Sequence, residues 1–145
     1  MCSLIQDKTR VRVSSVLNSD VKQFGKSFLF DCQDDTCWNS SEGTPQWILV
    51  DLGTQAEIKE IAINFQGGFA GKDCWIETSP SINSNELKYL CKFYPEDDST
   101  LQIFPIIESP TAQLIKIVFN TSTDFYGRII VYKLDIIGVT QQKSD

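Results

Sequence analysis

The chain has 145 residues, of which 41% are hydrophobic and 11% aromatic, so it can form one domain with a sizeable core but is too short for two. Lys and Arg total 13 against 19 Asp and Glu, and the net charge of −6 disfavours direct binding to nucleic acid and to anionic membranes. The chain contains no histidine, which excludes Ser-His-Asp and Cys-His nucleophile pairs, HExxH zinc sites and histidine proton shuttles.

Short strands are predicted along most of the chain. Residues 9–14 alternate polar and apolar side chains, as a half-buried strand does, and residues 19–23 indicate a short helical turn. The apolar run at 47–52 predicts a buried strand that ends at Gly53, and a second helical turn is expected at 54–58. Further strands are predicted at 58–65, 74–78, 89–94, 101–106, 114–119 and 129–137.

The regular spacing of these short strands predicts an all-β fold, a β-sandwich. We expect a single domain over residues 9–139, with flexible tails at 1–8 and 140–145. Between two predicted strands, the loop at 67–73 carries two adjacent glycines followed by Phe69, which places an aromatic side chain on a flexible loop.

An acidic turn is predicted at residues 31–38, whose sequence is Asp-Cys-Gln-Asp-Asp-Thr-Cys-Trp. Carboxylate and carbonyl oxygens gathered on one turn are the ligands that a hard cation such as calcium requires. The spacing does not match an EF-hand, because the glycine at the sixth position and the closing glutamate are both missing. Two interpretations stay open: a structural calcium site, or a turn whose Asp and Thr side chains cap their own backbone.

The five cysteines are an odd number, so they cannot all pair within one chain. The first residues lack the apolar segment of a secretory signal, and we expect a soluble intracellular protein with reduced thiols. Cys32, Cys37, Cys74 and Cys91 could form a four-thiolate zinc site, although no CxxC spacing occurs among them. The alternatives are small buried hydrophobic residues and a single exposed reactive thiol.

Two further segments combine charged with aromatic residues. Asp97 and Asp98 follow an aromatic strand end, and they are either a pair of acid-base carboxylates or part of a solvated turn. The segment 124–128, Asp-Phe-Tyr-Gly-Arg, is rich in residue types that contribute most to protein interfaces. Alternatively, Phe125 or Tyr126 plugs the end of the sandwich and Arg128 pairs with a nearby carboxylate. No nucleophile has an identifiable base and no GxxxxGK[ST] loop occurs, so the sequence does not predict an enzyme.

Several blocks occur in the order found in a known family. They are Asp31, Asp-Thr-Cys-Trp at 35–38, Gln-Trp-Ile-Leu-Val-Asp-Leu-Gly at 46–53 and Lys-Leu-Asp-Ile-Ile-Gly at 133–138. Together they resemble the discoidin domain, the coagulation factor V/VIII C-type module of the galactose-binding-like superfamily. The resemblance implies a jelly-roll β-sandwich in which Trp38 and Trp47 fill the core. It also implies Asp31, Asp34 and Thr36 as ligands of a structural calcium.

The chain departs from the family pattern at two positions near its end. Val139 stands where extracellular relatives have the second cysteine of a terminal disulfide, which favours an intracellular protein. Ile137 stands where calcium-binding relatives have a glutamate that reaches the ion, so one expected metal ligand is missing. No required cofactor is therefore expected, and the calcium is a hypothesis.

The similarity is greater to one intracellular branch of the family, which is described as repressing an orphan nuclear receptor, and it extends from about Val11 to Gly138. It implies a non-catalytic interaction module of the nucleus and cytoplasm that binds such a receptor and interferes with its binding to DNA. The alternatives are a lectin-like module that binds carbohydrate, with or without calcium, and a subunit of a larger complex of the ubiquitin-ligase or ciliary type. The residues that we expect to contact a partner are Phe69, Trp75, Phe125, Tyr126 and Arg128.

Overall fold

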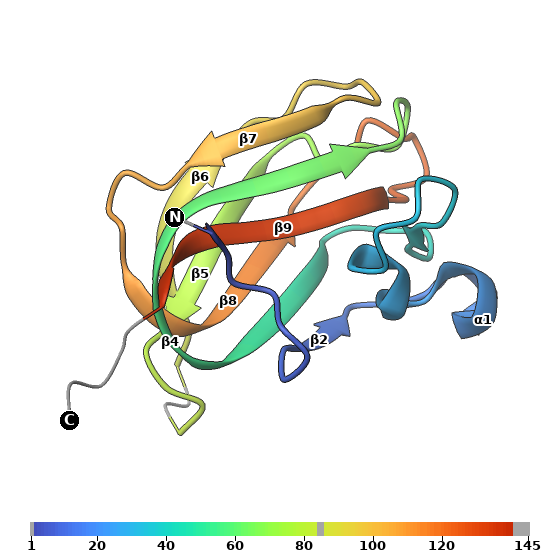
Figure 1. The fold of residues 1–145 in the computed structure, drawn as a ribbon. Coiled ribbons are helices and arrows are strands. Elements are labelled where there is room, and N and C mark those ends of the chain that lie inside the picture. The colour runs from blue at the N-terminus through green and yellow to red at the C-terminus, as the bar shows by residue number, and fades with distance from the viewer. Residues whose placement is uncertain (1, 84–85, 141–145) are drawn as a thin grey trace, which may run out of the picture.

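The computed structural model describes residues 2–83 and 86–140 and is a β-sandwich (Figure 1). Between strands β2 (Arg10–Val13) and β3 (Trp38–Asn39) lie three short helical segments, η1 (Leu17–Ser19), α1 (Val21–Phe24) and η2 (Lys26–Leu29). Helix α1 overlaps the helical turn predicted at 19–23. No helix among the described residues is long and apolar enough to cross a membrane. The strands are β1 (Cys2–Ser3), β2 (Arg10–Val13), β3 (Trp38–Asn39), β4 (Gln46–Phe65), β5 (Cys74–Ser79), β6 (Lys88–Phe93), β7 (Leu101–Pro105), β8 (Thr111–Phe119) and β9 (Ile130–Thr140).

Strand β4 connects the two layers of the sandwich. Its first half pairs with β2 and β8, and its second half pairs with β7 and β9. One layer therefore has the order β2-β4-β8-β5-β6, while the other has β7-β4-β9-β1, and β3 also pairs with β9. All of the pairings are antiparallel, and the predicted all-β jelly-roll sandwich is confirmed.

The bend in β4 corrects two sequence predictions. Residues 54–58, predicted as a helical turn, are part of this 20-residue strand, and the runs at 47–52 and 58–65 are not separate strands. Gly53 does not end the strand. It adopts a φ of +78°, a conformation that glycine takes without a steric penalty, and the register with β8 shifts between Asp51 and Ala56. The strand thereby turns from one layer into the other without a helix.

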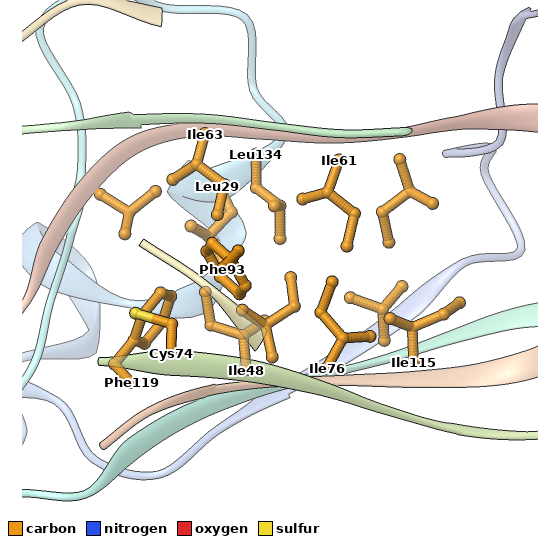
Figure 2. Close-up of a cluster of buried hydrophobic side chains, with 14 of the residues drawn as sticks. Leu29, Ile48, Ile61, Ile63, Cys74, Ile76, Phe93, Ile115, Phe119 and Leu134 are labelled. Atoms are coloured by element: carbon orange, nitrogen blue, oxygen red, sulfur yellow. The ribbon is translucent and has the colours of Figure 1, made fainter. Parts of the chain in front are cut away.

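The core fills the space between the two layers (Figure 2). Ile61 and Ile63 from the second half of β4 face Ile76 of β5 and Ile115 of β8, because alternate residues of a strand point to the same side. At one end of the core the Phe65 and Phe119 rings meet edge to face, with centroids 5.7 Å apart.

The two tryptophans that the resemblance places in the core differ in position. Trp38 is fully buried against Phe119, which agrees with the resemblance. Trp47, by contrast, is half-buried on the outer face of β4, because its neighbour Ile48 occupies the inward position. Its ring is covered by Lys116, whose Nζ lies 5.0 Å from the ring centroid.

Residues 2–4, which belong to the tail expected at 1–8, are part of the sandwich. Cys2–Ser3 pairs with β9, and the Leu4 N–H donates to the carbonyl of Ile136 at 2.7 Å. The Leu4 side chain is buried in the core. At the other terminus, Thr140 is the last residue of β9 and pairs with Ala56. Residue 1 and residues 141–145 of the expected tails lie outside the described residues.

Candidate functional site

Four loops meet at one end of the sandwich, on the side of Figure 1 away from the C-terminus. They join β3 to β4 (residues 40–45), β4 to β5 (66–73), β6 to β7 (94–100) and β8 to β9 (120–129). We call these four loops the loop end. Gly43 in the first loop donates its N–H to the carbonyl of Tyr126 in the last, at 2.7 Å, which holds two loops distant in sequence side by side.

Side chains of the 94–100 loop connect the other loops. One carboxylate oxygen of Asp97 accepts from the Gly68 N–H at 2.7 Å and from the Thr123 hydroxyl at 3.1 Å. The Ser99 hydroxyl accepts from the Gly67 N–H at 2.9 Å. Sequence reasoning missed this role, because Asp, Ser and Thr are common in any turn and their partners lie in other loops. The loop at 67–73 is therefore held by its neighbours.

The carboxylates at 97 and 98 do not form an acid-base pair. Asp97 accepts the hydrogen bonds just described, whereas Asp98 accepts from both the hydroxyl and the N–H of Thr100, at 2.6 and 3.0 Å. These bonds to Thr100 lower the pKa of Asp98, because they stabilise its ionised form. The arrangement is the turn that sequence analysis gave as the alternative.

Arg128 is held from two sides. Its backbone N–H and its Nε donate to one oxygen of Asp124, at 3.0 and 3.1 Å, and its guanidinium carbon lies 4.8 Å from the centroid of the Phe69 ring. Burial raises the pKa of Asp124, but the hydrogen bonds and the charge of Arg128 outweigh burial, so this pKa lies below its ordinary value. Phe69 and Arg128, which sequence analysis proposed separately, therefore form one unit.

Phe125 and Tyr126 protrude from the same loop. Their side chains are 93% and 58% exposed, and the two rings pack edge to face with centroids 5.3 Å apart. They therefore do not plug the end of the sandwich. Gly127 follows them with a φ of +82°, and a Cβ at this position would lie 2.9 Å from the backbone of Gly43.

Trp75 belongs to strand β5 and to none of the four loops, although the pocket that it lines also includes Asp73, Tyr94 and Asn120 of the loop end. It is half-buried on the outer face of β5, and its indole N–H donates to a carboxylate oxygen of Glu77 at 2.7 Å. Its ring lines a small pocket of about 260 Å³ together with Lys92 and Tyr94. The structure thus brings together Phe69, Phe125, Tyr126 and Arg128 at the loop end and places Trp75 on the neighbouring sheet face.

The proposed calcium ligands lie on one turn, but their oxygens already have partners in the chain. Asp31 accepts from the Thr36 hydroxyl at 2.6 Å through one oxygen and from the Gln33 N–H at 3.0 Å through the other. Asp34 forms an ion pair with Lys133, with 2.8 Å between Oδ1 and Nζ, and Lys133 lowers the pKa of Asp34. A calcium ion would have to compete with Lys133 for Asp34, and with the Thr36 hydroxyl and the Gln33 N–H for Asp31, so the donor set is poorly suited to calcium.

The cysteines do not gather at one place. Cys74 is buried, Cys37 and Cys91 are half-buried, and burial raises the pKa of all three thiols. Cys2 and Cys32 are exposed. Within the described part of the chain, no three His, Cys, Asp or Glu side chains are grouped so that they could hold a metal ion. The four-thiolate zinc site considered from the sequence is therefore not formed by these residues.

Comparison with known proteins gives consistent matches over most of the chain. The family model described as NedA-like, galactose-binding domain matches residues 28–117. A Danio rerio protein named nuclear receptor 2C2-associated protein is 53% identical over 136 residues, which cover 94% of this chain and 95% of that protein. The Homo sapiens protein of the same name is 41% identical over 138 residues, covering 94% of this chain and 96% of that protein.

A solved structure shows the same fold. The chitosan-binding module 1 of a chitosanase/glucanase from Paenibacillus sp. IK-5 superimposes with a TM-score of 0.78 at 21% identity, covering 95% of this chain and all of that one. At this level of identity the likeness concerns the fold alone, and it agrees with the two-layered sandwich described above.

Proposed function

The chain belongs to the family of nuclear receptor 2C2-associated proteins, with a galactose-binding-like domain, and we propose that it binds an orphan nuclear receptor through the loop end and represses its transcriptional activation. The family names and the type of domain point to a non-catalytic function. A receptor partner also implies that the protein acts in the nucleus and the cytoplasm.

The observation that carries this proposal is the exposed pair of Phe125 and Tyr126. Most of the binding energy of a protein interface comes from a few residues, and aromatic and arginine side chains are enriched among them. Here two aromatic rings protrude next to Arg128, on a loop whose base is held by a hydrogen bond that Asp124 accepts from Arg128 and by one that Gly43 donates to Tyr126. Because the loop is held in place before binding, little conformational entropy is lost when a partner covers the rings.

The charge of the chain supports interference with DNA binding. A net charge of −6 attracts a basic DNA-binding region and repels DNA itself. A protein with this charge competes with DNA for the same basic surface. Binding of this kind weakens as the salt concentration rises, because salt screens the attraction between exposed charges.

Calorimetric titration of purified receptor domains with this protein at physiological salt tests the proposal. We expect direct binding that is strongly weakened in the double variant Phe125→Ala/Tyr126→Ala. The matched control is Ile107→Ala, because Ile107 is 90% exposed in the loop between β7 and β8 and does not belong to the loop end. Absence of direct binding, or equal loss in the control variant, would contradict the proposal.

Carbohydrate is the second candidate ligand for the loop end. It is favoured by the exposed ring of Tyr126 beside Asp124 and Arg128, which combines an apolar face with charged hydrogen-bonding groups. The same fold occurs in a module that is named for binding chitosan. Titration with a panel of oligosaccharides, chitosan fragments included, distinguishes the two candidates. Heat from a sugar that the Tyr126→Ala variant abolishes would favour carbohydrate.

A further inference from the structure

A second surface, formed by other residues than the loop end, lies beside the edge strand β2. It is an open groove of about 680 Å³ between η2, β2 and the outer face of β4 and β8. We call it the basic groove and define it by three cationic and three apolar lining residues, Arg10, Arg12, Lys26, Leu49, Ile82 and Leu114.

The cations reach the groove from two elements. In β2 the sequence Arg-Val-Arg-Val places both valines against the core and both arginines on the exposed side. Arg12 lies opposite Leu49, and Arg10 lies opposite Asp51, on strand β4. Lys26 comes from η2, which packs beside β2. Three positive charges thus lie around one groove in a chain whose net charge is −6.

These cations have no acidic partner among the described residues. The ion pairs in that part of the chain join Lys59 to Glu57, Arg128 to Asp124 and Lys133 to Asp34, and none involves Arg10, Arg12 or Lys26. Asp51 also lines the groove, opposite Arg10, and one of its carboxylate oxygens accepts from the side chain of Gln113 at 3.0 Å and from the Gly53 N–H at 2.8 Å. The lining therefore carries three positive charges against one negative charge.

Apolar side chains lie between the charges. Leu49 and Leu114 are half-buried on the outer sheet face, and Ile82 is 59% exposed at the rim. Leu49 of β4 pairs with Lys116 and Leu114 of β8 pairs with Asp51, so the two leucines are diagonal neighbours on adjacent strands. A ligand here meets an apolar floor and a positive rim, so it needs both apolar groups and negative charges.

We propose that the basic groove binds an acidic peptide segment of a protein partner, in which apolar side chains alternate with Asp or Glu. The apolar side chains would cover Leu49 and Leu114, and the carboxylates would face Arg10, Arg12 and Lys26. Nucleic acid fits less well than a short acidic peptide, because a long polyanion extends beyond the groove and is repelled by the rest of a chain whose net charge is −6. Trp47, on the outer face of the same strand as Leu49, already has Lys116 over its ring, which leaves less of the ring for a base to stack on.

Fluorescence polarisation of a short labelled peptide in which leucines alternate with aspartates and glutamates tests the proposal on the full chain. We expect saturable binding that weakens as salt is added. The double variant Arg12→Glu/Lys26→Glu should bind about 10-fold more weakly or worse, because both charges then repel the peptide. Lys88→Glu is the matched control, since it reverses an exposed charge outside both the groove and the loop end and should leave the affinity unchanged.

Two further probes decide the chemistry of the ligand. The same peptide with Asn and Gln in place of its acids should not bind, and neither should a labelled single-stranded oligonucleotide. Equal binding of the neutral peptide, preferential binding of the oligonucleotide, unchanged affinity in the double variant, or no binding of the acidic peptide would each overturn the proposal. If the double variant fails to give a wild-type melting curve, Arg10→Gln replaces it, because this change removes one charge without adding repulsion.

Discussion

The loop end and the basic groove arrange the same kinds of side chain in opposite ways. At the loop end the charges of Arg128 and Asp124 neutralise each other, and the aromatic rings of Phe125 and Tyr126 are left exposed. In the groove Leu49 and Leu114 are half-buried, and the three cations form no ion pair among the described residues. The comparison shows that the free groups of a surface, more than its composition, indicate what it can bind. The first surface suits an apolar protein contact and the second an acidic segment.

The largest expected effect is that each of two double variants loses one ligand and keeps the other. Phe125→Ala/Tyr126→Ala should weaken receptor binding by about 30-fold or more, because truncation of an interface hot spot costs about 2 kcal/mol or more. The same variant should bind the acidic peptide as the wild type does. Arg12→Glu/Lys26→Glu should show the reverse, and titration of each variant with each ligand measures both effects. Loss of both ligands in either variant would mean that the two surfaces do not act separately.

The next effect concerns the stability of the loop end. Gly127→Ala should lower the free energy of unfolding by about 1–3 kcal/mol, because alanine is strained at a φ of +82° and its Cβ would press on Gly43. Gly43→Ala is the matched control: its φ is +98°, but its Cβ would meet open space. Urea unfolding should therefore give a lower free energy of unfolding for Gly127→Ala than for Gly43→Ala. Equal losses would show that the contact between the two loops is loose.

The charge pair at the loop end predicts a pH dependence. The folded-state pKa of Asp124 is below its ordinary value of about 3.9, so its stabilisation is present above about pH 4 and is lost as the pH falls through the folded pKa. Asp124→Asn lacks this contribution at every pH. The difference in melting temperature between wild type and variant should thus narrow below about pH 4. A constant difference down to pH 3 would refute the pairing.

The smallest expected effect is that of calcium. As at the loop end, the carboxylates of the acidic turn already have partners within the chain. Asp31 accepts hydrogen bonds from Thr36 and Gln33, and Asp34 forms an ion pair with Lys133. Neither calcium nor a chelator should shift the melting temperature, since a ligand that does not bind the folded state cannot stabilise it. Asp34→Asn should give the same null response. A calcium-dependent rise that this variant abolishes would restore the metal hypothesis.

The sequence predicted the sandwich well because strands are encoded locally. Alternation and apolar runs located most strands to within a few residues. The family resemblance, and not the strand pattern, placed Trp38 correctly in the core. The course of β4 could not be predicted, since Gly53 has the pattern of a strand end and only pairing with β7 and β9 carries the strand onward. Pairing of Cys2–Ser3 with β9 is likewise a contact between distant residues.

The two surfaces were predictable to different degrees. Phe69, Phe125, Tyr126 and Arg128 were proposed as contact residues because aromatic and arginine residues on loops are recognisable by type. Their meeting at one end, and the tethers from Asp97, depend on the fold. The groove was missed, although Arg-Val-Arg-Val already indicates two arginines on one strand face. Its third cation, Lys26, approaches only through the packing of η2.

Hydrogen exchange measured on the wild-type protein, alone and with purified receptor, tests the central claim most directly. If the receptor covers the loop end, amides in the loops at 66–73 and 120–129 should exchange more slowly in the complex, while those of β2 and of the loop between β7 and β8 should not change. Protection confined to β2 and η2, or to the loop between β7 and β8, would contradict the assignment of the receptor site to Phe69, Phe125, Tyr126 and Arg128.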